Sequence, residues 1–370
     1  MTGTLCLESS KEWEDENMNS VDRRKFLRVT GSAAASVVAV GAGKTPIRVG
    51  VFGTQHGHTN SKMRALRANS DYEIVAVHEP NESARKNRQS QELFAGLQFI
   101  SEDALLADDS LDLIMVECSI WEAIKWGNKV LDAGRHLHLE KPPSPDLDPF
   151  RKLVEKAKRK RLLLQQGYNY RFHPCIRAAI EAAQKGWLGD VYLMRATMNS
   201  NRGKKSRASE AKYPGGAFFE LCGHMIDRAV ELWGRPDKTT SFMRHDTSEP
   251  DELKDNTLAV LEYDKSMAVI STAAKMANAG AHRSFELVGS EGSFFIQPIS
   301  GDRTMRVNMS EARGPYKKGW QDIKFEPHIY DKYEFEDMAH AIRTGGPLSY
   351  SYDHELLVHE TLLRASGHMT

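Results

Sequence analysis

The stretch IRVGVFGTQHGH, residues 47–58, decides the fold. Its first seven residues form a short apolar run that ends in Gly53, which is typical of a buried strand in a parallel sheet. A polar, helix-compatible stretch follows, and YEIVAVHEP (72–80) predicts a second strand that Pro80 stops. A strand, a glycine turn, a helix and another strand are the opening of a βαβ unit.

The same alternation continues to about residue 170. We expect further strands over 111–119, 135–143 and 162–170, and helices over 81–95, 121–134 and 145–161. This order predicts an α/β fold with a parallel sheet covered by helices on both faces. We therefore assign residues 46–170 to a Rossmann dinucleotide-binding domain.

The pattern changes after residue 171. We expect helices over 176–186, 216–234, 333–345 and 354–367, and strands over 190–200, 257–275 and 283–298, of which the last two each fold around a turn. Runs of strands with few helices between them indicate an open, mostly antiparallel sheet. Residues 171–370 are thus predicted to be an α+β domain for substrate and oligomer contacts, and its open sheet face favours a homo-oligomer.

The composition excludes several classes of protein. A length of 370 residues suggests two domains, and 40% hydrophobic residues exclude a mostly disordered chain. Fifty basic residues balance fifty acidic ones, so no overall attraction to nucleic acid is expected. No apolar run reaches the roughly 18–20 residues that span a bilayer.

Residues 1–45 are predicted to lie outside the fold. Arginines at 23–24 precede Phe26-Leu27 and an uncharged run over 29–43. A basic start, a short apolar segment and small residues at its end resemble a twin-arginine signal, which exports folded proteins. The protein is then periplasmic or otherwise exported. The alternative is a disordered, alanine-rich N-terminus on a cytoplasmic protein.

The turn after the first strand is a candidate nucleotide site. Glycines such as Gly50 and Gly53 let backbone N–H groups approach a pyrophosphate, although Gln55 and His58 replace the second and third glycines of GxGxxG. Glu79 ends the second strand, where a carboxylate can accept a hydrogen bond from a ribose hydroxyl. This favours NAD, and NADP is not excluded. The alternative is a plain strand–helix turn.

Two further groups can carry acid–base chemistry. Lys141 follows a predicted strand at its carboxyl end, where it can donate a proton to a carbonyl or alkoxide, or belong to an ordinary loop. Glu220, His224 and Asp227 are spaced i, i+4 and i+7, so they share one face of a predicted helix. They can act in acid–base chemistry, bind a metal, or form a partly exposed helix face. We assign no metal site to the sequence.

Together the motifs resemble the Gfo/Idh/MocA (glucose-fructose oxidoreductase / inositol dehydrogenase) family over roughly residues 46–368. The resemblance rests on their order along the chain: GVFG, DAGRHLHLEKP, GYNYRFHP, GGAFFELCGHMID and FELVGSEGSFF. It implies a Rossmann domain, a C-terminal open sheet and hydride chemistry on a hydroxyl of a sugar or cyclitol. Two departures are that Cys118-Ser119-Ile120 replaces the family's Thr-Pro-Asn turn and that Ala123 replaces a histidine.

The resemblance also assigns roles to residues. Lys141 and His224 match the family's catalytic lysine and histidine, Glu220 falls where many members carry an aspartate, and Asp227 matches an acid that faces the substrate. Asn169 and Arg171 are assigned to the substrate. The residues assigned to the cofactor are Gly50, Gly53, Thr54, Gln55, His56, Glu79, Cys118, Ser119, Glu140 and Pro142.

The resemblance implies an NAD(P)-dependent oxidoreductase with a small-molecule sugar or cyclitol substrate. Because free NAD is scarce outside the cytoplasm, an exported member is expected to hold its cofactor tightly. One alternative is an NAD-dependent enzyme that cleaves glycosides through transient oxidation. The other is a non-catalytic sugar-binding protein that has lost the cofactor.

Overall fold

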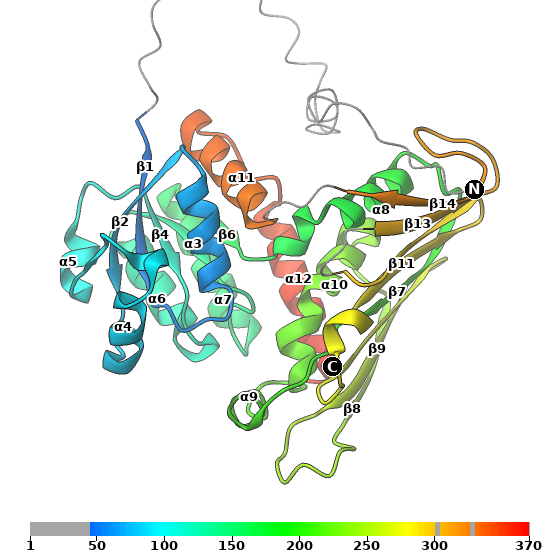
Figure 1. Cartoon of the computed structure of the whole chain (residues 1–370), viewed down its shortest axis with the longest axis horizontal. Helices are drawn as coiled ribbons and strands as arrows, with labels where there is room; N and C mark the ends of the chain where they lie inside the picture. The colour runs from blue at the N-terminus through cyan, green and yellow to red at the C-terminus, as the bar shows by residue number, and fades with distance from the viewer. Residues whose placement is uncertain (1–44, 300–303, 326–329, 370) are drawn as a thin grey trace, which may run out of the picture. The chain divides into compact units, whose positions relative to one another are not determined.

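The computed structural model describes residues 45–299, 304–325 and 330–369. The predicted export signal lies outside these residues. The described chain forms two sheets, one of six strands and one of eight (Figure 1). Within the described ranges, no helix is both long and apolar enough to cross a membrane.

The six-stranded sheet confirms the predicted Rossmann fold. Its spatial order is β3-β2-β1-β4-β5-β6, and all its neighbouring pairs are parallel. The chain runs outward from β1 in one direction to β3 and in the other to β6, so the order reverses between β1 and β4, where such sheets bind ligands. The strands are β1 (Ile47–Phe52), β2 (Tyr72–His78), β3 (Gln98–Phe99), β4 (Leu113–Val116), β5 (His136–Leu139) and β6 (Leu164–Gln166).

The helices of this part arise from apolar stripes that face the sheet. In α6, Ala123, Trp126 and Val130 are buried at helical spacing, and Trp126 stacks on Phe52 of β1 with ring centres 4.3 Å apart. The sequence analysis missed β3 and α5, because two and six residues are too few to show a period. The helices are α3 (Thr59–Ala68), α4 (Glu82–Gln89), α5 (Glu102–Ala107), α6 (Ile120–Asp132) and α7 (Leu147–Lys160), with 3₁₀ turns η1 (Glu92–Phe94) and η2 (Asn169–Phe172).

The eight-stranded sheet confirms the predicted, mostly antiparallel second sheet. Its order is β14-β13-β12-β11-β7-β10-β9-β8, and only the β7–β10 pair is parallel. The sequence analysis missed β8, β13 and β14. The edge strands β8 and β14 read KTTSFMR and GWQDIK, which carry little apolar alternation. The strands are β7 (Val191–Thr197), β8 (Lys238–Arg244), β9 (Asn256–Glu262), β10 (Met267–Ala273), β11 (Ser284–Gly289), β12 (Gly292–Ile296), β13 (Thr304–Met309) and β14 (Gly319–Lys324).

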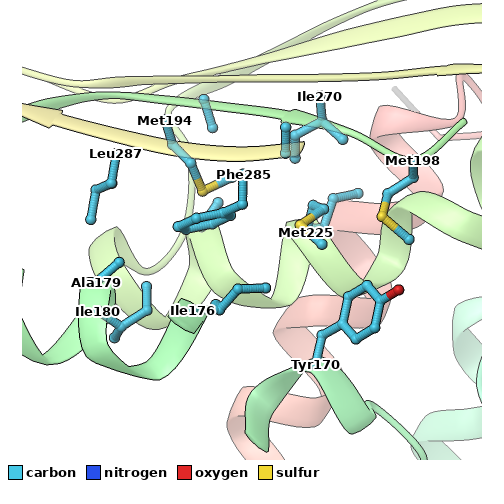
Figure 2. Packing of buried hydrophobic residues seen from close by; sticks show 14 of the residues in the cluster. Tyr170, Ile176, Ala179, Ile180, Met194, Met198, Met225, Ile270, Phe285 and Leu287 are labelled. Carbon is cyan, nitrogen blue, oxygen red and sulfur yellow. The ribbon is translucent and has the colours of Figure 1, made fainter. Parts of the chain in front are cut away.

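Helices cover one face of this second sheet (Figure 1). Figure 2 shows the core between them, where Phe285 and Met194 from the sheet lie near Ile176 of α8 and Met225 of α10. All four side chains are fully buried. The helices after β6 are α8 (Pro174–Gln184), α9 (Lys204–Glu210), α10 (Ala217–Trp233), η3 (Ala279–His282), α11 (Tyr330–Thr344) and α12 (Tyr352–Ala365).

Helix α11 returns to the Rossmann part, although it follows the second sheet in the chain, whereas the buried residues Val358 and Leu362 of α12 pack in the core of the second sheet. In α11, Phe335 and Met338 belong to the same buried cluster as Val49 of β1 and Met63 of α3. The Tyr72 hydroxyl donates a hydrogen bond to the Phe335 carbonyl oxygen at 2.5 Å. Helix α11 therefore helps to hold the start of β2 and the β1 side of the Rossmann core in place.

Candidate active site

The turn after β1 is tight and holds Glu79. Gly53 has φ +84°, and a Cβ there would lie 2.6 Å from the Trp126 ring, so only glycine fits. The next residue, Thr54, donates to the Glu79 carboxylate from its backbone N–H at 2.8 Å and from its hydroxyl at 2.6 Å. The Gln55 side-chain amide donates to the other Glu79 oxygen at 3.1 Å. Glu79 is thus placed at the end of β2, buried against the loop.

The backbone of the loop also contacts the end of β4. The N–H groups of Gln55 and His56 donate to the Glu117 carbonyl oxygen at 3.2 and 3.4 Å. In contrast, Gly57 is exposed, and a Cβ added there would meet no described atom within 4 Å. The loop is therefore closed on its β4 side and open at Gly57.

A fully buried lysine lies below the loop. The Lys62 ammonium of α3 lies 2.5 Å from Glu140 Oε1, 3.3 Å from Glu117 Oε1 and 2.7 Å from His138 Nε2. His138 Nδ1 lies 3.0 Å from the side-chain oxygen of Gln165. His138 therefore carries its proton on Nδ1 and accepts from Lys62 at Nε2. Burial, followed by the charge of Lys62, lowers the pKa of His138 to about 3.

The two carboxyl groups bound to Lys62 differ in charge. Burial alone would raise the pKa of Glu140, but Lys62, His56 and His58 hold it well below its ordinary value. Burial raises the pKa of Glu117 to about 7, and Lys62 opposes this only in part. Glu140 is therefore a stable anion at neutral pH, whereas Glu117 exchanges a proton near pH 7.

Lys141 and Glu220 form a direct pair. The Lys141 ammonium donates to the Glu220 backbone oxygen at 2.9 Å and lies 3.2 Å from Glu220 Oε1. Lys141 is nearly fully buried. Burial opposes ionisation of Glu220, but Lys141 and His56 outweigh it and lower the pKa of Glu220 to about 2. The structure thus joins the predicted lysine at the end of β5 to the predicted carboxylate on α10.

His224 is the neutral base of the site. Its ring is buried among Tyr170 at 4.7 Å, Tyr168 at 5.8 Å and His58 at 6.1 Å between ring centres. Burial, followed by the charge of Lys141, keeps the pKa of His224 well below its ordinary value. Its Nδ1 has no hydrogen-bond partner among the residues that the structure describes. A neutral imidazole with a free nitrogen can accept a proton.

Asp227 lies in a separate ion network. Arg171 donates to both oxygens of Asp227, at 2.8 to 3.2 Å, and also binds Glu355 of α12 at 2.6 and 2.7 Å. Arg228 and His354 contact Asp227 as well. Neither Asp227 nor Glu220 hydrogen-bonds to the His224 ring. Asp227 and Arg171 thus bind each other in the described chain, rather than projecting free toward a substrate.

The other predicted site residues differ in how far they are exposed to solvent. Gly50 faces Leu111 in the core, where a Cβ would come within 2.9 Å of that side chain, so close packing accounts for this glycine and its assignment to the cofactor stays a prediction. Ser119 is exposed at the start of α6 beside buried Cys118. Pro142 and Asn169 are buried near the end of β5 and in η2.

The strand edge fits a dinucleotide in three respects. The loop follows β1 at the point where the strand order reverses, Gly57 leaves open space above it, and Glu79 offers a carboxylate at the end of β2. A pyrophosphate held by the N–H groups of Gln55 and His56 would take the place of the Glu117 carbonyl oxygen that they bind. Ribose hydroxyls likewise have to replace the Gln55 amide on Glu79.

Four residues of the site were not predicted to act there: His58, Lys62, Glu117 and Tyr168. In the pattern HGH at 56–58, His56 was assigned to the cofactor and His58 was read only as a departure from a glycine motif. Lys62 and Glu117 lie on a helix and at a strand end without a local motif. Their meeting depends on the sheet order, which places β4 and β5 beside the loop after β1.

Fold and site define a class of protein, an oxidoreductase built on a dinucleotide-binding domain. Residues 47–168 match the oxidoreductase family with an NAD-binding Rossmann fold, and residues 176–295 match the GFO/IDH/MocA C-terminal domain. The chain belongs to the Gfo/Idh/MocA family of NAD(P)-dependent oxidoreductases.

Known relatives agree with this assignment. An uncharacterised oxidoreductase of Schizosaccharomyces pombe is 27% identical over 59% of this chain and 60% of its own length. The scyllo-inositol 2-dehydrogenase (NAD(+)) of Bacillus subtilis is 25% identical over 74% of this chain and 79% of its own. The structure of a 3-ketoreductase from Actinomadura kijaniata with NADP and TDP-benzene matches with TM-score 0.73 and 20% identity, over 86% of this chain and 96% of that one, which shows the shared fold.

Proposed function

We propose that this protein transfers hydride between a hydroxyl-bearing carbon of a sugar or cyclitol and a tightly held nicotinamide dinucleotide. The observation that carries the proposal is the pairing of Lys141 with Glu220 beside the neutral ring of His224. A fixed cation and a neutral base at the carboxyl edge of a Rossmann sheet are what oxidation of an alcohol requires.

The chain's own residues divide the work on the hydroxyl. The Lys141 ammonium, held by Glu220, stabilises the developing alkoxide, and the neutral imidazole of His224 accepts the hydroxyl proton. In the reverse direction, the same ring returns the proton. The bound dinucleotide supplies the hydride acceptor. The backbone N–H groups of the loop from Gly53 to His58 would hold its phosphates, Glu79 its ribose, and Ser119 and Pro142 the nicotinamide end.

The retained cofactor is tested directly on purified protein. The full chain is produced in a host cytoplasm, freed of small molecules by gel filtration and denatured, and the supernatant is analysed for dinucleotide by mass spectrometry. We expect near-stoichiometric NAD or NADP. Protein that is empty and shows no thermal shift with either added dinucleotide contradicts the proposal.

One observation favours a second candidate, a sugar-binding protein without a cofactor. The N–H groups of Gln55 and His56 already bind the Glu117 carbonyl, so the loop is complete without a pyrophosphate. For this candidate, sugar binding by titration calorimetry is expected while neither dinucleotide binds. The same purified protein therefore separates the two functions.

Export with the cofactor already loaded is part of the proposal. The basis is the twin-arginine-like stretch around residues 23–43. Cell fractionation tests it: the wild type should be exported, and a variant with lysines at Arg23 and Arg24 should stay in the cytoplasm. Equal export of both contradicts it.

A further inference from the structure

Two histidines and a carboxylate meet beside the Lys141–Glu220 pair. His56 and His58 lie on the loop after β1, and Glu140 ends β5. One ligand atom from each of the three lies within 4.8 Å of the other two. His56 Nδ1 is 3.4 Å from Glu140 Oε2, and His58 Nδ1 is 3.0 Å from Glu140 Oε1. Both imidazoles are partly accessible from solvent, so an ion can reach them.

The carboxylate of this cluster is already oriented. Lys62 binds Glu140 Oε1 at 2.5 Å, and the Lys141 backbone N–H donates to Glu140 Oε2 at 3.0 Å. A Cβ at Gly167 would lie 2.5 Å from both Glu140 Oε1 and the Lys62 nitrogen, so a glycine there leaves room for the pair. Such outer contacts fix a carboxylate ligand of a metal before the metal arrives.

The charges around the cluster leave room for a cation. The carboxyl groups that face it are Glu140, Glu117 at 3.8 Å from His56 Nδ1, and Glu220 at 3.9 Å from His56 Nε2. The ammonium groups are those of Lys62 and Lys141. Three carboxyl groups therefore face two cations.

A nearby buried donor atom is also unused. His224 Nδ1 has no hydrogen-bond partner among the described residues, and the His224 ring centre lies 6.1 Å from that of His58. Buried polar atoms normally have a partner, so His224 is a further unsatisfied group beside the two histidines of the cluster.

We propose that His56, His58 and Glu140 bind one divalent transition-metal ion of the zinc type. Two imidazole nitrogens and one carboxylate oxygen are the protein ligands of many catalytic zinc sites, which keep a further position open. The site lies at the end of β5, three strands from Glu79 at the end of β2, or about 14 Å at the usual strand spacing. It is therefore at the reacting end of the strand edge rather than at the ribose end.

The open position would face the acid–base groups. A hydroxyl bound to the ion becomes more acidic, which helps the transfer of its proton to His224. This use of the ion rests on the proposed function, whereas binding of the ion does not. The group that would occupy the open position of the ion is an oxygen of a hydroxyl group or of a water molecule.

The test measures metal alone on untagged, full-length protein that has been treated with a chelator and dialysed. Zn²⁺ binding is followed by titration calorimetry and bound metal by elemental analysis, and Co²⁺ provides a visible spectrum that reports its ligands. We expect one ion per chain for the wild type, and at least about tenfold weaker binding for His56→Ala and His58→Ala. His340→Ala, at an exposed histidine on α11, should bind as the wild type does.

Thermal unfolding of each variant without metal verifies that it is folded. Because both ligand substitutions lie on a half-exposed loop, the midpoints of thermal unfolding of these variants should match that of the wild type. Wild-type protein that takes up no stoichiometric Zn²⁺ or Co²⁺ overturns the site, as does unchanged binding in His56→Ala and His58→Ala. No dinucleotide or sugar is present in these measurements. Absence of dinucleotide binding would therefore refute the proposed function without refuting the metal site. Absence of metal binding would overturn the metal site without refuting the proposed function.

Discussion

Lys62 carries a positive charge in a place that solvent does not reach. Its ammonium group neutralises Glu140 at 2.5 Å and Glu117 at 3.3 Å. Lys62→Met leaves these carboxyl groups buried without their cation, so we expect a loss of about 3–5 kcal/mol in the free energy of unfolding. Denaturant unfolding measures this. Lys86→Met removes an exposed lysine that pairs with Glu82 and should change stability by no more than about 0.5 kcal/mol. Equal losses in both variants would contradict the account.

His138 makes stability depend on pH. Its pKa is about 3 in the folded chain, against about 6.5 when unfolded, so the unfolded state binds the extra proton. The stability that the neutral ring contributes is complete above pH 6.5 and is lost as the pH falls toward 3. We expect His138→Gln to reduce the slope between pH 6.5 and 4.5 by up to about 1.4 kcal/mol per pH unit. Denaturant unfolding at several pH values measures it, with His340→Gln as the exposed control. An unchanged slope in His138→Gln would show that the ring is not held neutral.

At the residue scale, the sequence predicted which acid–base residues gather at the candidate site better than it predicted their partners. Lys141, His224 and Glu220 were identified from motif position and helical spacing. However, spacing placed Glu220 and Asp227 with His224, whereas Lys141 and the arginine network bind them. Helical spacing says which residues share a face, but the groups opposite that face come from other elements, which no local pattern records.

At the element scale, glycine pairs mark close approaches between elements. Gly216 has φ +61° just before α10, and a Cβ there would lie 2.8 Å from the Lys254 backbone oxygen. Gly216→Ala therefore combines backbone strain with a steric clash. We expect the free energy of unfolding to fall by at least about 1–3 kcal/mol and the midpoint of thermal unfolding to fall with it. Gly203→Ala, before α9, meets no described atom within 4 Å and should cost less than about 1 kcal/mol. If the two variants unfolded at the same temperature, the close approach would not exist.

Long, strongly patterned elements could be predicted, and short or edge elements could not. Strands β1 and β4 are buried almost throughout and appear as apolar runs. The strands β8 and β14 lie at the two edges of the second sheet, where pairing on one side alone allows polar residues. The segment 199–216 contains the short helix α9, and Arg207 ties that helix to Asp251 and Asp255.

At the scale of the whole molecule, one face of the second sheet offers an apolar surface. In β9, Ala259 and Leu261 point into the core, so Val260 points to the other face, opposite Val269 of β10. Phe242 on β8 is 55% exposed. Because such a surface is stabilised by covering it, we expect a dimer or tetramer through this face.

The oligomer is tested by light scattering coupled to gel filtration. Val260→Glu should lower the mass toward that of one chain, because it places a charge in the centre of the proposed contact. Trp121→Glu, at an exposed tryptophan of α6, should not change the mass. A single-chain mass for the wild type, or an unchanged mass for Val260→Glu, would contradict a contact through the sheet.

The parallel sheet and the mostly antiparallel sheet could be predicted at this scale, but the return of α11 to the first sheet could not. Both C-terminal helices have ordinary amphipathic patterns, which say that an apolar face is buried without saying against what. Phe335 packs with the β1 side of the Rossmann core, and no local sequence pattern predicts this contact.

The central claim is that Lys141 takes part in hydride transfer at this strand edge. The most direct measurement is formation of reduced dinucleotide by the wild type and by Lys141→Ala across a panel of sugars and cyclitols, with dinucleotide affinity measured in parallel. We predict that the wild type is active on at least one member and that Lys141→Ala loses about 10²–10⁴-fold in rate while it still binds the dinucleotide. Equal rates in both proteins, or no activity and no dinucleotide binding in the wild type, would contradict the account.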